Sequence, residues 1–406
     1  MSLARVFVPF ACGYFLSYLY RVINAVIAPD LVAELKLDAA ELGFLTSAYF
    51  LTFALFQLPL GMLLDRFGPR RTEAALLMFA ALGAFVFATA SGIGGLVAGR
   101  ALIGFGVSAC LMAAFKAFRI FFAAAKLPLI SGFQMAIGGL GALSGTVPVE
   151  AALGVTDWRG VFITLGIVTI AVGFVIFLVA PEKEGEEADG ATFGELLGGI
   201  GVIFRSFTFW RIAPLTVASQ STFLSIQSLW AGPWLRDAAG LGRDAVAFHL
   251  LAIAGAMIAG FLLLGALSER LARKGVPLIV LVIGCSAVFM VILSAIVGAG
   301  TGAPLILWMG FGFFGTSGIL PYSLLSQSFP AHLAGRVITG LNFLVFAGAF
   351  GAQWGIGAVI NLWPPGAGGA YPLVAYDVAF SLMLALQALA LTWFAFATLG
   401  FGKSSE

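Results

Sequence analysis

The sequence predicts an all-α membrane protein of twelve transmembrane helices in two six-helix pseudo-symmetric halves. Hydrophobic residues make up 61% of the 406 residues and charged residues only 10%, whereas a soluble domain carries roughly 25% charged residues. A helix needs about 20 apolar residues to span a bilayer, so twelve helices with short loops account for the length. The 52 glycines fit this class, because small residues let membrane helices approach closely.

The composition also excludes several classes of protein. The net charge is only +2, so the chain lacks the basic excess that nucleic-acid binding needs. Its three cysteines and two histidines are scattered, which argues against a metal site or a disulfide framework, and we expect no cofactor. The sequence holds no recognisable nucleophile with its base and no Gly-x-x-x-x-Gly-Lys-Ser/Thr string. We therefore expect neither an enzyme nor a pump driven by ATP.

Apolar runs between charged or Gly/Pro-rich breaks give the expected order of the helices. In the first half they cover residues 6–28, 42–64, 72–91, 94–118, 128–152 and 159–180. In the second half they cover residues 209–232, 245–268, 276–298, 304–328, 335–362 and 376–399. The acidic stretch in the middle predicts a cytoplasmic linker at 181–208, between an N-terminal bundle at 1–180 and a C-terminal bundle at 209–406.

Basic residues set the expected orientation, because cytoplasmic loops of membrane proteins are enriched in Lys and Arg. With the N-terminus in the cytoplasm, fifteen of the 21 basic residues fall in cytoplasmic segments and five fall outside. This bias predicts a multi-pass protein of the cell inner (cytoplasmic) membrane with both termini in the cytoplasm.

One loop pattern occurs once in each half, at positions 204 residues apart. Each copy has a glycine, three variable residues, an acidic residue and an arginine, with further basic residues after them. The residues concerned are Gly61, Asp65, Arg66, Gly68, Arg70 and Arg71 in the first half, and Gly265, Glu269 and Arg270 in the second. Parallel six-helix repeats are typical of secondary transporters whose halves rock around a central site.

The first loop, residues 61–71, resembles the loop signature of the major facilitator superfamily. Arg100 with Gly104 and Gly106 resembles the motif in that superfamily's fourth helix. Residues 157–159 are similar to its Gly-Trp-Arg entry to the sixth helix, with Asp in place of Gly. The resemblance covers the whole chain and implies transport by alternating access.

The resemblance also implies a gate that holds the cytoplasmic side closed in the outward-facing state. The residues expected in this gate are Gly61, Asp65, Arg66, Gly68, Arg70, Arg71 and Arg100, with Glu269 and Arg270 from the second half. Physically, the Asp65 carboxylate can pair with the neighbouring basic residues or cap the N-terminus of an adjacent helix. The alternative is that Arg70 and Arg71 serve only to set the topology.

Arg21 is the clearest candidate for a substrate contact, because it lies deep within the first expected helix. Ser17, Arg21 and Asn24 share one helical face, and a guanidinium offers five donors suited to a carboxylate or phosphate. Residues 17–21 resemble the first-helix arginine region of organophosphate:phosphate antiporters and related organic-anion transporters, which implies that Arg21 binds the anionic group. The alternative is that Arg21 snorkels or pairs with Asp30 or Glu34.

The seventh helix departs from the antiporter pattern, because it has no second arginine at mid-depth. Its central face instead carries Gln220, Phe223, Gln227 and Trp230. One arginine with amides and aromatic rings favours a singly charged, carboxylate-bearing metabolite over a phosphorylated one. The remaining polar candidates for the substrate site are Tyr49, Gln57, Lys116, Gln134, Tyr322, Asn342, Gln353 and Trp354. Lys116 has an equal alternative as an anchor at the inner membrane interface.

Few carboxylates are available inside the membrane to carry a coupled proton. Glu150, near the outer end of the fifth expected helix, is the best candidate, whereas Asp30, Glu34, Glu73 and Asp377 are expected at the interfaces. Proton symport, exchange for a counter-anion and uniport all remain open.

These observations predict a secondary active transporter that moves a small organic anion across the cytoplasmic membrane. Its expected partners are the small-molecule substrate, the lipid bilayer, and a co-transported proton or counter-anion, and we expect it to act as a monomer without nucleic acid. One alternative is an exporter of drugs or amphipathic metabolites with the same fold. Another is a membrane sensor that transports nothing.

Overall fold

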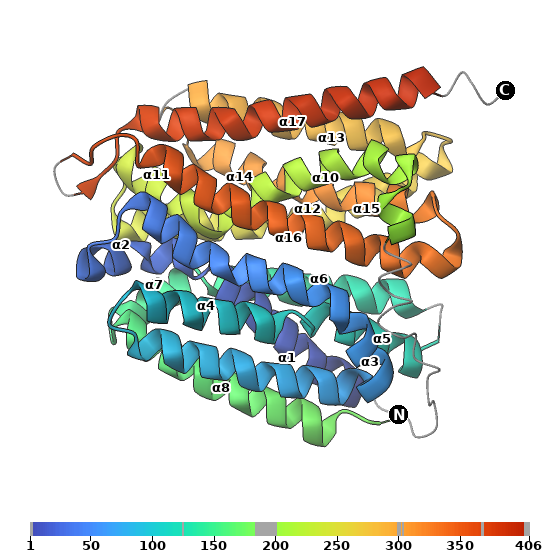
Figure 1. Cartoon of the computed structure of the whole chain (residues 1–406), viewed down its shortest axis with the longest axis horizontal. Coiled ribbons are helices and arrows are strands. Elements are labelled where there is room, and N and C mark those ends of the chain that lie inside the picture. The colour runs from blue at the N-terminus through green and yellow to red at the C-terminus, as the bar shows by residue number, and fades with distance from the viewer. Residues whose placement is uncertain are drawn as a thin grey trace.

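The computed structural model describes residues 3–123, 126–182, 201–298, 302, 304–366 and 369–401. Within these residues every regular element is a helix, and the long helices run side by side along one direction (Figure 1). The predicted all-α class is therefore confirmed. Most of the expected linker at 181–208 lies outside the described residues, so the boundary between the two bundles stays a prediction.

The helices of the first half, blue to green, lie in the lower part of Figure 1. They are α1 (Leu3–Val22), α2 (Asn24–Leu35), α3 (Ala39–Thr89), α4 (Ile93–Val107), α5 (Cys110–Phe121), α6 (Leu127–Ser144), α7 (Val147–Leu153) and α8 (Trp158–Val179). Helix α3 is kinked at Gly68, where φ is +75°, a conformation that glycine adopts without a steric penalty. The kink explains why α3 covers two expected spans, 42–64 and 72–91.

The helices of the second half, green-yellow to red, lie in the upper part of the same view (Figure 1). They are α10 (Phe207–Ser225), a π-helical turn (Ile226–Trp230), α11 (Ala231–Asp237), α12 (Arg243–Arg273), α13 (Leu278–Gly298), α14 (Pro304–Gly315), a 3₁₀ turn (Thr316–Ile319), α15 (Leu320–Gln327), α16 (Ala331–Ile360) and α17 (Leu373–Phe401). The expected span at 209–232 thus runs through α10 and the π-helical turn into α11.

In the described part of the chain, nine helices are long and apolar enough to cross a membrane. The number becomes ten if α1 and α2, which meet at an angle of 45°, form one bent span. Because α3 contains two expected spans and α10–α11 contains another, the described helices are compatible with twelve crossings. The count of twelve itself stays a prediction.

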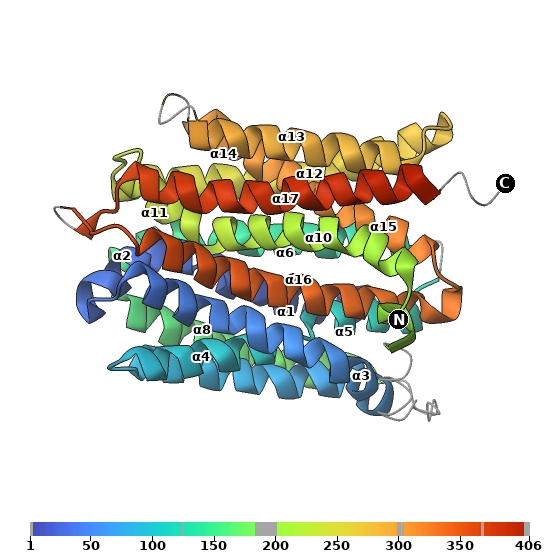
Figure 2. The same ribbon diagram turned by 45° about the horizontal axis from the view of Figure 1, so that its top comes forward.

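The two halves meet closely where α16 lies along α3 (Figures 1 and 2). Glycines make this approach possible, because a Cβ atom at Gly357 would lie 2.3 Å from the carbonyl oxygen of Ala39. A Cβ atom at Gly43 would lie 2.8 Å from the carbonyl oxygen of Gln353. Any larger residue at either position would therefore push the halves apart.

The molecule has two different ends along its helices. One end, which we call the α2 end, carries α2, α7 and α11, and the other, the terminal end, is where α1 begins and α17 ends (Figure 1). Among the described residues, every side-chain hydrogen bond or ion pair that joins the halves lies toward the α2 end. These contacts are Arg243 with Asp30 and Glu150, Asn361 with Asp38, Tyr371 with Ala39, and Gln353 with Thr46. Polar contacts therefore join the two halves at the α2 end.

Candidate functional site

A cavity of about 390 Å³ lies between the two halves, lined by residues of both. This volume is within the usual range for small-molecule sites. Seven of the residues predicted to contact substrate line it, namely Ser17, Arg21, Gln57, Gln220, Gln227, Tyr322 and Asn342. Phe53, Phe223 and Phe346 contribute aromatic rings to the lining of the same cavity. The structure thus brings these seven residues together from helices that are distant along the chain, and their role in substrate binding stays a prediction.

Arg21 contributes a positively charged side chain to the lining of this cavity, and only 5% of its surface is exposed. Its guanidinium carbon lies 4.4 Å from the ring centroid of Tyr18 and 5.3 Å from that of Phe346. Its Nε atom has no hydrogen-bond partner, and within the described residues no carboxylate forms an ion pair with it. The predicted alternative of pairing with Asp30 or Glu34 is wrong, because those two carboxylates bind other groups.

Three helices hold the part of α1 that carries Arg21. Arg100 of α4 donates from Nη1 to the carbonyl oxygen of Tyr20 at 2.9 Å, and its guanidinium lies over the ring of Tyr49. The Tyr49 hydroxyl donates to the carbonyl oxygen of Ser17 at 3.2 Å, while the Tyr20 hydroxyl lies 2.9 Å from that of Thr169 on α8. These contacts fix the depth and rotation of α1 around the guanidinium. Arg100, predicted as a gating residue, thus lies behind the cavity.

The amides of the cavity are oriented by bonds to their own half. Gln220 donates through Nε2 to the carbonyl oxygen of Gly315 at 2.9 Å, and Gln57 donates to that of Ser108 at 3.2 Å. The Tyr322 hydroxyl donates to Oδ1 of Asn342 at 2.7 Å. In the described part of the structure, the carbonyl oxygens of Gln57 and Gln220 accept no hydrogen bond. They can therefore accept hydrogen bonds from hydroxyl groups of a bound molecule.

Seven predicted contacts do not line the cavity, namely Asn24, Tyr49, Lys116, Gln134, Trp230, Gln353 and Trp354. Gln134 donates to the carbonyl oxygen of Phe10 inside the first half. The side-chain amide of Gln353 donates to the Thr46 hydroxyl and accepts from the Ser228 hydroxyl. Its backbone carbonyl oxygen accepts from the Trp230 indole. These two glutamines therefore join helices. Asn24 is buried without lining the cavity, whereas Trp354 is 44% exposed and lies against Phe44.

The predicted gate loop makes contacts that differ from those expected. The Asp65 carboxylate pairs with Nζ of Lys116 on α5 at 2.5 Å, and Lys116 also donates to the carbonyl oxygen of Leu64. Arg70 and Arg71 both pair with Glu182, which follows α8. The sequence thus missed Lys116 as the partner of Asp65, because the two residues are 51 positions apart.

Among the residues that the structure describes, the other predicted gate residues form no matching latch in this conformation. Glu269 pairs with Arg273 one turn away on its own helix, at 3.8 Å, and Arg66 lies over the ring of Phe67. A Cβ atom at Gly61 would meet nothing within 4 Å. The gating role of Gly61, Arg66, Glu269 and Arg270 stays a prediction.

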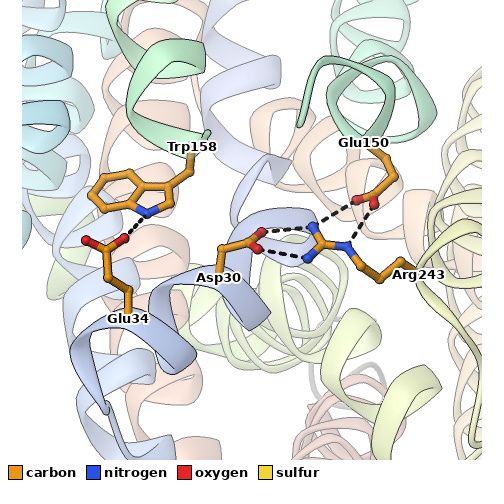
Figure 3. A network of polar contacts seen from close by, with 5 residues as sticks. All are labelled: Asp30, Glu34, Glu150, Trp158 and Arg243. Atoms are coloured by element: carbon orange, nitrogen blue, oxygen red, sulfur yellow. Dashed lines mark hydrogen bonds and ion pairs between the residues drawn. The ribbon is translucent and has the colours of Figure 1, made fainter. Parts of the chain in front are cut away.

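Glu150 lies outside the cavity, in an ion-pair network at the α2 end (Figure 3). Arg243 at the start of α12 donates to both carboxylate oxygens of Asp30, each at 2.8 Å, and from Nε to Glu150 at 2.8 Å. Glu34 beside them accepts a hydrogen bond of 2.8 Å from the Trp158 indole (Figure 3). Asp30 and Glu150 belong to the first half and Arg243 to the second, so this cluster bridges the two.

Glu73 is the buried carboxyl group that the sequence placed wrongly. We expected it at a membrane interface, but its exposed fraction is 0%. The missed signal is helical spacing, because Leu77, Ala80 and Ala84 lie on the same face of α3 and are equally buried. A position two residues after Arg71 suggested a surface site, whereas this periodicity indicates the interior of the bundle.

Comparison with known proteins places this arrangement in a family. Residues 10–353 match the model of the Major Facilitator Superfamily. A probable sulfoacetate transporter of Cupriavidus necator is 23% identical over 64% of each chain. The hexuronate transporter of Escherichia coli is 28% identical over 50% of each chain. A probable L-galactonate transporter of Escherichia coli is 28% identical over 48% of this chain and 44% of its own. The matched part thus spans about half to just under two thirds of these relatives.

Solved structures agree on the fold. A bacterial homolog of the human lysosomal transporter Spinster, in an inward-facing and occupied conformation, superposes with a TM-score of 0.78 over 99% of both chains. A D-xylose-proton symporter superposes with a TM-score of 0.74 over 97% of both chains. At 16% and 15% identity, these likenesses show the fold alone. Since the family match covers most of the sequence, the chain belongs to the Major Facilitator Superfamily.

Proposed function

We propose that this protein is a secondary active transporter of a small organic anion with a single carboxylate. The observation that carries the proposal is Arg21, a buried guanidinium in a cavity between the halves that has no carboxylate partner in the described structure. A buried charge is costly unless it is paired. The aromatic rings around Arg21 offset part of this cost through cation–π attraction, and a bound anion would offset much more.

The lining of the cavity supports the class of substrate. Arg21 is the one cationic residue among those that line it, so a singly charged ligand would be neutralised there. The free carbonyl oxygens of Gln57 and Gln220, with the hydroxyl of Tyr322, suit a ligand that also carries hydroxyl groups. The hexuronate and L-galactonate transporters among the relatives are named for molecules of this kind. A sugar acid is therefore the substrate class that we favour. Another relative is named for sulfoacetate, and this compound tests a ligand that carries a sulfonate as well as a carboxylate.

The contacts between the halves support alternating access. The predicted topology puts both termini in the cytoplasm, and the α2 end then faces outward. The Arg243 network fastens the halves at that end, so this conformation corresponds to a carrier closed to the outside. Transport would require these ion pairs to break while the opposite end closes, and we propose that Asp65 and Lys116 belong to the gate at that end.

The aromatic rings that contact Arg21 favour a second candidate function. Tyr18, Phe53 and Phe346 lie within 5.6 Å of its guanidinium carbon, and export of an amphipathic metabolite could use the same apolar wall. The two candidates differ in what Arg21 does. An anion carrier needs its charge, whereas an exporter of neutral or cationic amphipathic compounds does not.

Transport in proteoliposomes tests the proposal. Purified protein is reconstituted and assayed for uptake of labelled glucuronate, L-galactonate and sulfoacetate, together with a cationic dye as the representative of the exporter. We expect uptake of at least one anion, lost in Arg21→Ala and retained in Arg119→Ala, a change at an exposed position outside the cavity. Dye transport without anion uptake, unaffected by Arg21→Ala, would favour the exporter instead.

A further inference from the structure

A second buried ionisable group, the carboxyl group of Glu73, lies outside the cavity in the first half. This residue is on α3, five positions after the kink at Gly68, and its side chain is fully enclosed by the first half. Within the described structure, neither carboxyl oxygen has a hydrogen-bond partner of good geometry, and the side chain that comes nearest to being one is Cys110. The thiol of Cys110, on α5, is the titratable side chain that faces it, and a thiol is only a weak donor.

The groups that pack against Glu73 leave its charge uncompensated. On α1 it faces Gly13, and the apolar side chain of Ile176 on α8 lies against the same position of α1. The basic residues that precede it on its own helix, Arg70 and Arg71, both pair with Glu182. Of the basic residues deeper in the half, Arg100 donates to the carbonyl oxygen of Tyr20, and Arg21 lines the cavity. An isolated carboxylate is very costly to bury, whereas the neutral acid costs far less, so the protonated form is the one that fits this site.

The space for the carboxyl group is provided by a glycine on the helix that carries Arg21. A Cβ atom at position 13 would lie 2.1 Å from Oε1 of Glu73, well inside contact distance. Gly13 therefore forms a niche in α1 that any other residue would fill. Arg21 follows eight residues later on the same helix, about 12 Å away at 1.5 Å per residue. A movement of α1 thus changes the surroundings of both groups together.

We propose that Glu73 is a proton-binding site of the N-terminal half whose protonation is coupled to occupancy of Arg21. This proposal rests on the transport function proposed above and names its coupling ion. In the conformation described here Glu73 holds its proton. When α1 moves away and water reaches the niche, the O–H bond of the acid ionises, the proton passes to water as hydronium, and the carboxylate remains. Binding a proton from water on return of α1 completes the cycle.

This assignment replaces Glu150 as the candidate for proton coupling. Glu150 is bound by Arg243 at the α2 end, where an ionised carboxylate is satisfied by its partner. Glu73 has no such partner among the described residues, and it adjoins the helix of the anion site. One proton carried with one monovalent anion makes the transport step electroneutral. Uptake should therefore respond to a pH gradient and not to a membrane potential.

Two measurements on the same variant test the proposal, one of them independent of transport. Infrared difference spectroscopy of the purified protein should show a carboxylic-acid C=O band at neutral pH that disappears in Glu73→Gln. The band should persist in the control Glu269→Gln, whose residue lies on the surface of α12. In proteoliposomes, Glu73→Gln should retain anion exchange at equal pH and lose accumulation driven by an inward proton gradient. An unchanged band or unchanged accumulation in Glu73→Gln would overturn the proposal.

These two measurements distinguish a failure of the proton-site proposal from a failure of the proposed substrate class. If wild-type protein transports none of the anions but the infrared band vanishes in Glu73→Gln, the substrate class is wrong and the proton site stands. Should Glu73→Gln fail to fold, wild-type protein can be treated with dicyclohexylcarbodiimide, which attaches to protonated carboxyl groups in apolar surroundings. Modification found at Glu73 by mass spectrometry supports the proposal, and its absence from Glu73 while other sites react contradicts it.

Discussion

Arg243 at the start of α12 holds Asp30 of α2 through two hydrogen bonds of 2.8 Å, across the boundary between the two halves. The same guanidinium binds Glu150 of α7 (Figure 3). Paired donors that face both oxygens of a carboxylate make a directional contact. The cluster therefore sets the relative position of the halves at the α2 end, and breaking it is the first step that we expect in opening that end.

Arg243→Ala should shift the protein toward a conformation that is open at the α2 end. The pairs are partly exposed, with side-chain exposures of 45% for Arg243 and 30% for Asp30, and such pairs contribute about 0.2–1 kcal/mol each. Loss of both pairs, about 0.4–2 kcal/mol together, shifts the conformational populations by roughly two- to thirty-fold. Distances between spin labels at positions 155 and 362, both exposed and in opposite halves, report the change in a background without native cysteines.

A matched control for this experiment is Arg159→Ala. Arg159 pairs with Glu34 at the same end of the molecule, but both residues belong to the first half. The control should leave the distance distribution unchanged. A distribution that is the same in Arg243→Ala and wild type would show that the ion pairs do not hold the halves together.

Asp65→Asn should slow transport while leaving equilibrium binding of the anion unchanged. The substitution removes the charge that binds Lys116 at the terminal end, and neither residue lines the cavity. Lys116→Arg should retain more activity than Lys116→Ala, because it keeps a cation within reach of Asp65. Initial rates in proteoliposomes of equal protein content measure the effect, and a wild-type rate in Asp65→Asn would exclude this pair from the gate.

Arg100→Gln should weaken anion binding although Arg100 does not touch the cavity. Its guanidinium donates to the carbonyl oxygen of Tyr20, next to Arg21, and a hydrogen bond from a charged donor contributes about 1.5–3 kcal/mol. Loss of this bond frees α1 to rotate or shift, so we expect a several-fold rise in Kd with a smaller effect for Arg100→Lys. Calorimetry measures the affinity, and an unchanged Kd in Arg100→Gln would mean that α1 is positioned by its other contacts.

Glu150→Gln should leave the response to a pH gradient intact. Its partner Arg243 retains Asp30 in this variant, so the α2 end should be weakened and not fully released. We expect transport to remain driven by an imposed proton gradient, with a modest change in rate. Loss of gradient-driven accumulation in Glu150→Gln, with normal exchange at equal pH, would return proton coupling to Glu150.

The sequence predicted those features that depend on where charge and apolar runs fall along the chain. The helical class follows from the apolar runs, and Arg21 was recognised because a cation is rare so deep within a transmembrane helix. The cavity amides on α3 and α10 followed from their helical faces. These inferences need no knowledge of how distant helices pack.

The residues that the sequence placed wrongly all depend on rotation about a helix axis or on a distant partner. Gln353 was predicted to contact substrate because it is a polar residue within an expected transmembrane helix. Its side chain instead donates to Thr46 across the interface between α3 and α16. Lys116 had two equal interpretations until its distance from Asp65 was known. Glu73 adjoins a loop in sequence, yet its side chain is fully buried in the bundle. For Gln353 and Lys116 only the packed structure fixes the direction, whereas for Glu73 the helical spacing with Leu77, Ala80 and Ala84 was a signal that the sequence already held.

The affinity of the Arg21→Ala variant for glucuronate, L-galactonate and sulfoacetate tests the central claim most directly. Isothermal titration calorimetry compares wild type, Arg21→Ala and Arg21→Lys under conditions in which all three are folded. Because the Arg21 contact with a carboxylate is worth about 1.5–3 kcal/mol, we expect Arg21→Ala to bind the preferred anion roughly 10- to 100-fold more weakly, with partial retention in Arg21→Lys. Equal affinity in wild type and Arg21→Ala for every anion that binds would contradict the account.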